Sequence, residues 1–333
     1  MATRPPLARE VGSFSKNLSN TSPMIRAEML LLSSCNFKCP YCRGYKSISR
    51  DCSKDMDFDT AVEIIKIWIS DGLQNIRFSG GEPTLYKGLV DLVKICKEGG
   101  IKRIAISSNG SADFSLYEEL VRAGVNDFSI SLDSCCSSFG NAMTGVEGNN
   151  WEKVIENIPK IAKLTYVTVG VVLTETNVHQ TKDIINFAHN LGVADIRIIS
   201  AAQYNKLLEG LEGLDSKILD SHPILKYRID NLNHGINVRG IKEGDCHKCY
   251  IVKDDSVVAG SGKDVYHYPC VIAMREGCEP IGKVGPNMRK ERIEWFKTHD
   301  SFRDKICRDN CLDCIILHNS KCEKYEKEKL NEG

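Results

Sequence analysis

Short apolar runs rich in Ile, Val and Phe recur along the first two thirds of the chain, and helical patterns separate them. The apolar runs occupy residues 27–32, 75–78, 103–107, 127–132, 166–172 and 195–199. Apolar residues at helical spacing fill residues 58–69, 85–97, 116–123, 151–164 and 179–191. Strands that alternate with helices predict an α/β fold with parallel pairing, in either a barrel-like or an open doubly wound sheet. In both arrangements ligands collect at the C-terminal ends of the strands.

This strict alternation ends near residue 200. Residues 204–219 and 222–232 have the pattern of polar helices that connect two parts of the chain. After residue 245 the segments are short and punctuated by Gly, Pro and Cys, with a hairpin over 252–265 and an amphipathic helix around 293–302. We expect a polar N-terminal tail at 1–23, a core at 24–205, a helical connector at 206–245 and a small α+β module at 246–333.

Charge and composition narrow the classes of function. Lys+Arg and Asp+Glu are 44 each in 333 residues, so the net charge is zero and no long-range attraction to nucleic acid or an anionic membrane is expected. No apolar run approaches the length of a membrane-spanning helix, and residues 1–20 lack the apolar region of a secretory signal. We expect a cytoplasmic protein with neither nucleic acid nor membrane as a partner.

The chain contains 15 cysteines, far more than a reduced protein with a full core needs. Three lie together near the first apolar run, and eight lie between residues 246 and 322. Clusters on either side of a cysteine-poor middle favour metal or redox chemistry over disulfides.

The first group, Cys35, Cys39 and Cys42, follows the first predicted strand and therefore lies in a loop at the ligand-binding end of the sheet. Three thiolates at such short intervals can bind three irons of a [4Fe-4S] cluster. The fourth iron is then open to a ligand, as in catalytic zinc sites that keep one position free. A zinc site with a fourth protein ligand, or a chance grouping of thiols, is the alternative interpretation.

With Tyr41 before the last cysteine, this C-x3-C-x2-C spacing resembles the signature of the radical S-adenosylmethionine (SAM) enzymes. Gly80, Gly81 and Glu82, after the second strand, resemble the GGEP motif that holds the methionine end of SAM in that family. Glycines allow close approach of the backbone to a ligand, and a glutamate can pair with an ammonium group. Taken alone, the motif is equally compatible with a turn before a helix.

Two further polar segments follow the third and fourth strands. Ser108 with Asn109, and Ser131 with Asp133, resemble the positions at which relatives present hydroxyl and amide groups to SAM. A helix N-cap or a turn is the alternative for each segment. All four motifs fall at successive strand ends, which a single site requires.

The resemblance implies a partial (β/α)6 TIM-like barrel with a [4Fe-4S] cluster that has an open iron site, and SAM as cofactor. It also implies a reducing partner such as flavodoxin or ferredoxin, and a radical SAM oxidoreductase or lyase as the type of enzyme. No catalytic residue beyond the cofactor site is predicted.

The C-terminal cysteines resemble the auxiliary-cluster modules called SPASM and twitch. Cys249, Cys270, Cys311 and Cys314 match the twitch intervals and would ligate at least one auxiliary [4Fe-4S] cluster. Cys246 and Cys322 complete the candidate metal ligands, while Cys278 and Cys307 remain without a role. A zinc-ribbon-like structural site is the alternative, because paired CxxC motifs are also a zinc signature.

The favoured function is hydrogen abstraction from a small-molecule substrate of the sugar, aminocyclitol or nucleoside type, with redox help from an auxiliary cluster. A peptide or protein maturase that forms a cross-link, a molybdenum-cofactor-type GTP cyclase and a non-catalytic metal-binding protein are the alternatives. The GTP cyclase is disfavoured because the C-terminal end lacks paired glycines and the chain has extra cysteines. Gln203, Tyr204 and Arg239 are candidate substrate contacts.

Overall fold

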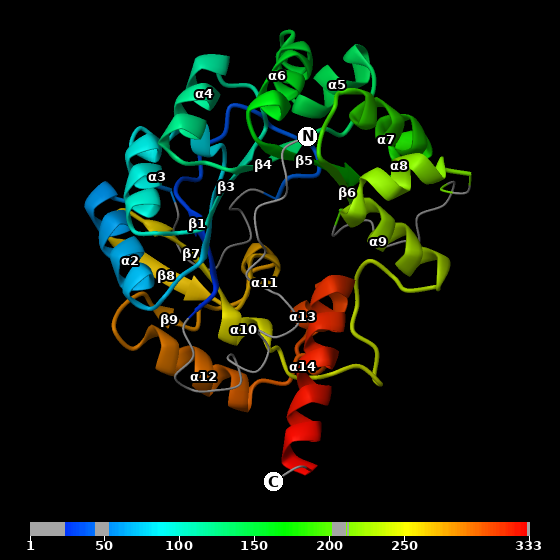
Figure 1. Cartoon of the computed structure of the whole chain (residues 1–333). Helices are drawn as coiled ribbons and strands as arrows, with labels where there is room; N and C mark the ends of the chain where they lie inside the picture. Colours follow the sequence, from blue (N-terminus) through cyan, green and yellow to red (C-terminus); the bar gives the residue numbers. More distant parts are fainter. Residues whose placement is uncertain (1–23, 44–52, 202–210, 212, 332–333) are drawn as a thin grey trace.

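The computed structural model describes residues 24–43, 53–201, 211 and 213–331. Its centre is one nine-stranded sheet in the order β6-β5-β4-β3-β2-β1-β7-β8-β9. The six N-terminal strands pair in parallel: β1 (Arg26–Leu30), β2 (Asn75–Ser79), β3 (Arg103–Ser108), β4 (Asp127–Ser131), β5 (Tyr166–Leu173) and β6 (Asp195–Ser200). The sheet curves with its helices outside (Figure 1), which confirms the predicted partial barrel.

Helices connect each of these strands to the next. They are α2 (Phe58–Ser70), α3 (Leu89–Glu98), α4 (Phe114–Ala123), α5 (Ser137–Thr144), α6 (Asn150–Leu164) and α7 (Thr181–Asn190). The helix predicted over 85–97 begins later, because Pro83–Leu85 forms a 3-10 turn and Gly88 stands at the N-cap of α3. The sequence analysis missed α5, whose short run SSFGNAMT lacks a clear apolar stripe.

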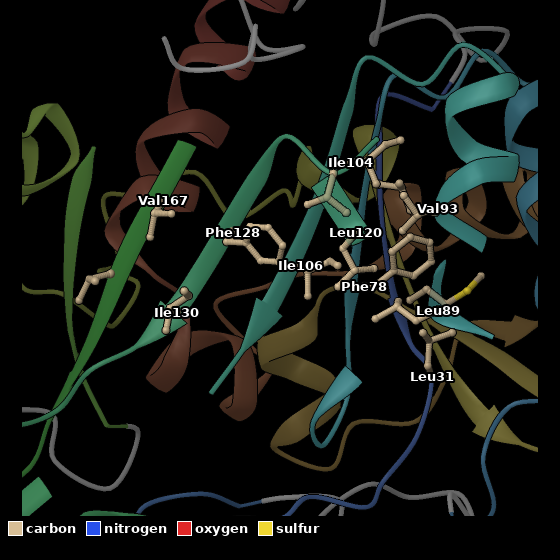
Figure 2. Close-up of a cluster of buried hydrophobic side chains, with 14 of the residues drawn as sticks. Leu31, Phe78, Leu89, Val93, Ile104, Ile106, Leu120, Phe128, Ile130 and Val167 are labelled. Carbon is tan, nitrogen blue, oxygen red and sulfur yellow. The ribbon is translucent and has the colours of Figure 1, made fainter. Parts of the chain in front are cut away.

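The core lies between the outer face of the sheet and the helices. Alternate residues of each strand point outward, so Phe78, Ile106 and Phe128 meet Val93 of α3 and Leu120 of α4 in one apolar cluster (Figure 2). All five side chains are fully buried.

The other alternate residues face the inside of the barrel and are largely polar or charged. This set includes Arg77, Ser107, Ser129 and Arg197, which alternate with the outward-facing residues of their strands. The barrel interior is therefore a polar space closed at its sides by the sheet.

The C-terminal region continues the same sheet. After α8 (Ser216–Ser221), α9 (Pro223–Asn233) and α10 (Ile251–Asp254), β7 (Asp255–Ser261) pairs in parallel with β1, and β8 (Asp264–Tyr268) forms a hairpin with β7. Then follow α11 (Val271–Arg275), β9 (Gly282–Lys283), α12 (Met288–Thr298), α13 (Lys305–Asn310) and α14 (Asp313–Asn331). The cysteine-rich part thus shares its sheet with the core, a connection that the sequence pattern did not predict.

None of the helices within the described residues has the length and apolar character needed to cross a membrane.

Candidate functional site

The first cysteine loop follows β1 at the C-terminal edge of the sheet. Cys35 and Cys42 are exposed and Cys39 is partly buried. Burial, together with the nearby Asp133, Cys42 and Cys35, raises the pKa of Cys39 to about 12. A cation bound between these thiols would supply the positive charge that stabilises thiolates in a buried place.

The loop is fixed to the end of β3 through an amide network. The Asn109 side chain donates to Asn36 Oδ1 at 2.8 Å and lies 4.0 Å from Cys35 Sγ, while Asn36 Nδ2 donates to Ser111 Oγ at 2.8 Å. Asn36, which the sequence analysis did not select, therefore connects the two predicted motifs. Its position directly after Cys35 was the feature of the sequence that could have indicated this role.

Tyr41 attaches the same loop to the end of β4. Its hydroxyl donates a short hydrogen bond to Asp133, which also accepts from Val172 N at 2.7 Å. Burial raises the pKa of Asp133 to about 6, against the lowering effect of these two bonds. The structure thus brings Tyr41 and Asp133 together, and they contact each other directly through this hydrogen bond.

The two glycines after β2 are required by close packing. Gly80 has φ 141°, and a Cβ on Gly81 would lie 1.9 Å from the carbonyl oxygen of Ser34. Gly81 N donates to Leu32 O at 2.7 Å, and Glu82 N donates to Ser34 O at 2.9 Å. The glycine motif therefore lies against the first cysteine loop, where its backbone can also reach a bound ligand.

Glu82 accepts hydrogen bonds from neighbouring parts of the chain. It is 1% exposed, and its carboxylate accepts from Thr84 N, Thr84 Oγ1, Ser108 Oγ and Asn109 N at 2.7 to 3.1 Å. Burial raises the pKa of Glu82, while these four bonds lower it. Both Glu82 and Ser108 therefore hold the ends of β2 and β3 together.

The remaining predicted contacts differ in exposure. Ser131 ends β4 with an exposed side chain, and Asn109 is also accessible. Arg239 is buried and donates to Ser200 O at 3.2 Å and to Asn310 O at 3.0 Å, so it joins β6 to the C-terminal cysteine segment. Gln203 and Tyr204 lie outside the described residues.

Arginines line the barrel interior below this edge. Arg77 donates to Ser107 Oγ at 2.7 Å, and burial lowers its pKa to about 10, so it stays cationic at neutral pH. Arg103 holds Asp127 in an ion pair. Arg197 lies over Gly170, with its Nη2 3.5 Å from the position of an added Cβ. Within the described part of the chain, no hydrogen-bond or ion-pair partner occupies the Arg197 guanidinium.

Four C-terminal thiols form a second group. Burial raises the pKa of Cys307, and neighbouring Cys270, Cys249 and Cys311 raise it further. The pKa of Cys249 rises to about 12 through burial and Cys270, and that of Cys311 rises through burial, Cys249 and Cys270. Cys307 thus belongs with three of the predicted ligands, and its C-x3-C interval to Cys311, like that of Cys35 and Cys39, was the missed signal.

The structure places Cys246 and Cys322 apart from this group. Cys278 and Cys314 adjoin it, because Cys270 raises the pKa of Cys278 after burial, and Cys314 is among the neighbours that raise the pKa of Cys311. Cys246 and Cys322 pack with Tyr250 in a separate apolar cluster, where His318 lies 3.5 Å from Cys322 Sγ. Cys314 is exposed and close enough to Arg197 to raise the pKa of that residue, against the dominant lowering by burial.

The spacing of the thiols bears on the choice between zinc and iron–sulfur. Four sulfurs around one zinc are about 3.8 Å apart, from a Zn–S distance of about 2.3 Å in a tetrahedron. Among the described residues, the only trio of metal-ligating groups with atoms within 4.8 Å of one another is His299, Asp304 and Cys307. This trio shares Cys307 with the C-terminal cysteine group, so a single-ion site at that thiol is the alternative to a cluster there.

An ion pair connects the two regions. Arg43, next to Cys42, lies 3.1 Å from Glu276 at the C-cap of α11. The first cysteine loop and the C-terminal region therefore meet at the same end of the barrel.

Comparison with known proteins identifies the family. Residues 29–188 match the model of the radical SAM superfamily, and this match includes the first cysteine triplet and the Gly80–Glu82 motif. The chain carries a radical SAM domain. Members use a [4Fe-4S] cluster and SAM, and the three thiols on one loop beside a close-packed glycine motif fit that pair of cofactors.

Among curated proteins, the chain is similar to GTP 3',8-cyclases. A probable GTP 3',8-cyclase from Sulfurisphaera tokodaii is 28% identical over 216 residues, which cover 60% of this chain and 67% of the relative. The GTP 3',8-cyclase of Alkaliphilus metalliredigens is 30% identical over 163 residues, covering 48% and 50%. The chain thus spans between about half and two thirds of the length of these two relatives.

Solved structures share the fold at low identity. Streptococcus suis SuiB bound to S-adenosylmethionine has a TM-score of 0.56 at 15% identity, covering 83% of this chain and 66% of SuiB. Native anSMEcpe with bound AdoMet has a TM-score of 0.57 at 17% identity, covering 91% and 95%. These similarities establish the fold of this radical SAM protein and nothing finer.

Proposed function

We propose that this chain is a radical SAM enzyme that acts on an anionic small molecule of the nucleotide type. Cys35, Cys39 and Cys42 hold the cluster with the open iron. When bound, the reduced cluster and SAM supply a 5'-deoxyadenosyl radical that abstracts hydrogen from the substrate.

The residues around the first loop hold that chemistry in place. The backbone of Gly80 and Gly81 and the exposed side chains of Asn109 and Ser131 are available to SAM at the strand ends. Glu82 and Asp133 act indirectly, because their carboxylates fix the loop segments that carry these groups.

The substrate class rests on one observation, the unpartnered cation inside the barrel. Arg197 is accessible, and Arg77 lies on the same inner face of the sheet. A phosphate group would provide the charge-assisted bonds that guanidinium groups favour. The similarity to GTP 3',8-cyclases supports a purine nucleotide, and GTP is the first candidate. A neutral sugar or aminocyclitol would add no anion beside Arg197, whose pKa burial lowers and Cys314 and Glu28 raise, so we place those substrates second.

The C-terminal group Cys249, Cys270, Cys307 and Cys311 would hold an auxiliary [4Fe-4S] cluster with four thiolates. The mutual influence of these thiols on their pKa values supports this assignment. An external reductant such as flavodoxin or ferredoxin would supply electrons to the first cluster.

The test is a substrate panel with anaerobically reconstituted, reduced protein. We expect GTP or a related nucleotide to increase the formation of 5'-deoxyadenosine at least tenfold over SAM alone, and neutral sugars to leave it unchanged. The Arg197→Met variant should raise the KM for the nucleotide, whereas Arg122→Met, on the exposed face of α4, should not. Equal responses to sugars and nucleotides, or an unchanged KM in Arg197→Met, contradict the proposed substrate class.

A further inference from the structure

Arg292 of α12 is a buried cation without a carboxylate partner. It is 2% exposed, and among the residues that the structure describes no Asp or Glu forms an ion pair with it. An isolated buried charge is costly unless an opposite charge lies nearby. The fold therefore places this guanidinium where another anion is expected.

The hydrogen bonds of Arg292 go to backbone carbonyls that flank two thiols. Its Nε donates to Val252 O at 3.0 Å, just after Cys249, and its Nη1 donates to Tyr268 O at 2.7 Å, just before Cys270. Nη2 donates to Asp255 O and, at 3.3 Å, to Pro269 O. One side chain thus joins the two segments that carry the first two thiols of the C-terminal group.

The guanidinium is also electrostatically close to these thiols. It lowers the pKa of Cys249 and of Cys270, against the dominant raising by burial. The other charged or titratable groups on this side are Asp255, which pairs with Arg26, and His267, which hydrogen-bonds Glu291. Burial lowers the pKa of Arg292 to about 10, while Asp255 and then Cys249 and Cys270 raise it. The negative charge of a four-thiolate iron–sulfur cluster would therefore add to that of Asp255 beside this guanidinium.

We propose that Arg292 is a positioning residue of the auxiliary cluster that also sets its reduction potential. Reduction adds negative charge to the cluster, and a fixed cation nearby favours the reduced state, so Arg292 raises the potential. This inference rests on the auxiliary cluster of the proposed function.

The test is a redox titration monitored by electron paramagnetic resonance. The full-length chain with Cys35, Cys39 and Cys42 replaced by Ala leaves only the auxiliary cluster to be observed. In this background we compare Arg292 with Arg292→Met, Arg292→Gln and Arg292→Lys. The control is Arg289→Met, because Arg289 lies on the same helix and faces Asp71 at 3.9 Å instead of the thiols.

We expect Arg292→Met and Arg292→Gln to shift the midpoint to more negative potential, and Arg292→Lys and Arg289→Met to leave it near that of the parent. If neither neutral variant retains auxiliary iron while the same substitutions in the otherwise native chain retain the first cluster, the positioning role is supported. A neutral variant that binds its full auxiliary iron and has an unchanged midpoint potential overturns the inference. Loss of soluble protein in both Arg292→Met and Arg292→Gln also overturns it. A parent that binds no auxiliary iron instead overturns the cluster assignment itself.

Discussion

The carboxylate of Glu82 offers a sharp test of how the glycine motif works. If the side chain bound the amino group of SAM, replacing it would weaken SAM binding and leave the folded protein intact. The structure instead engages both carboxylate oxygens internally, with three bonds to Oε1 and one to Oε2. The perturbation is therefore Glu82→Gln, which keeps the shape and removes the charge.

The magnitude follows from the bond pattern. Three donors can still reach the amide oxygen, but the amide NH2 then faces Asn109 N–H, which becomes an unsatisfied buried donor. One such group costs about 1 to 3 kcal/mol, so we expect Glu82→Gln to lower the free energy of unfolding by about 2 kcal/mol. Glu82→Ala removes all four acceptor interactions, and the lower bound for each gives at least about 4 kcal/mol.

The assay is urea unfolding of the metal-free protein, with the dissociation constant of SAM measured separately on the reconstituted protein. Glu98→Gln, at an exposed position near the end of α3, is the matched control and should be neutral. A Glu82→Gln protein with unchanged stability but at least tenfold weaker SAM binding would refute the structural role assigned to Glu82.

Three further substitutions test other parts of the site. Gly81→Ala should lower the free energy of unfolding by about 3 kcal/mol in urea, because its Cβ would overlap the backbone of the first cysteine loop. Gly244→Ala is the control and should leave the free energy of unfolding unchanged, because the space around Gly244 is open. Asp133 has a pKa raised from 3.8 to about 6, so its contribution to stability is present below pH 3.8 and declines as pH rises to 6. The stability of Asp133→Asn relative to wild type should therefore rise by about 2 kcal/mol between pH 4 and pH 7; a flat difference contradicts the assignment. Cys307→Ser should lose the auxiliary iron in a colorimetric iron assay, and Cys314→Ser should keep it; the reverse result favours the ligand set predicted from spacing alone.

The fold could be predicted from the sequence wherever the spacing of apolar residues distinguishes strands from helices. Six apolar runs alternating with helical stripes dictate a parallel sheet, and the choice of a barrel came from the resemblance of the motifs at the strand ends. The α5 helix was missed because its polar, Gly-containing sequence has no stripe. The pairing of β7 with β1 was missed because pairing between distant strands leaves no local pattern.

The site was predictable where ligands are close in sequence. Cys35, Cys39 and Cys42 are neighbours on one loop, and their spacing alone indicated a metal. The grouping of Cys307 with Cys249 required tertiary structure, since three strands (β7, β8 and β9) and three helices (α10, α11 and α12) separate them. The internal use of Glu82 was likewise hidden, because its partner Asn109 comes from a different strand end.

The central claim is that the first three cysteines alone hold the cluster that cleaves SAM. The most direct measurement is anaerobic quantification of 5'-deoxyadenosine and methionine formed by the reduced, reconstituted protein, beside a variant with Cys35, Cys39 and Cys42 replaced by Ala. The account predicts equal amounts of both products from the wild type and none from the variant, although the variant retains its C-terminal iron. No cleavage by a wild type with full iron content, or undiminished cleavage by the variant, would contradict it.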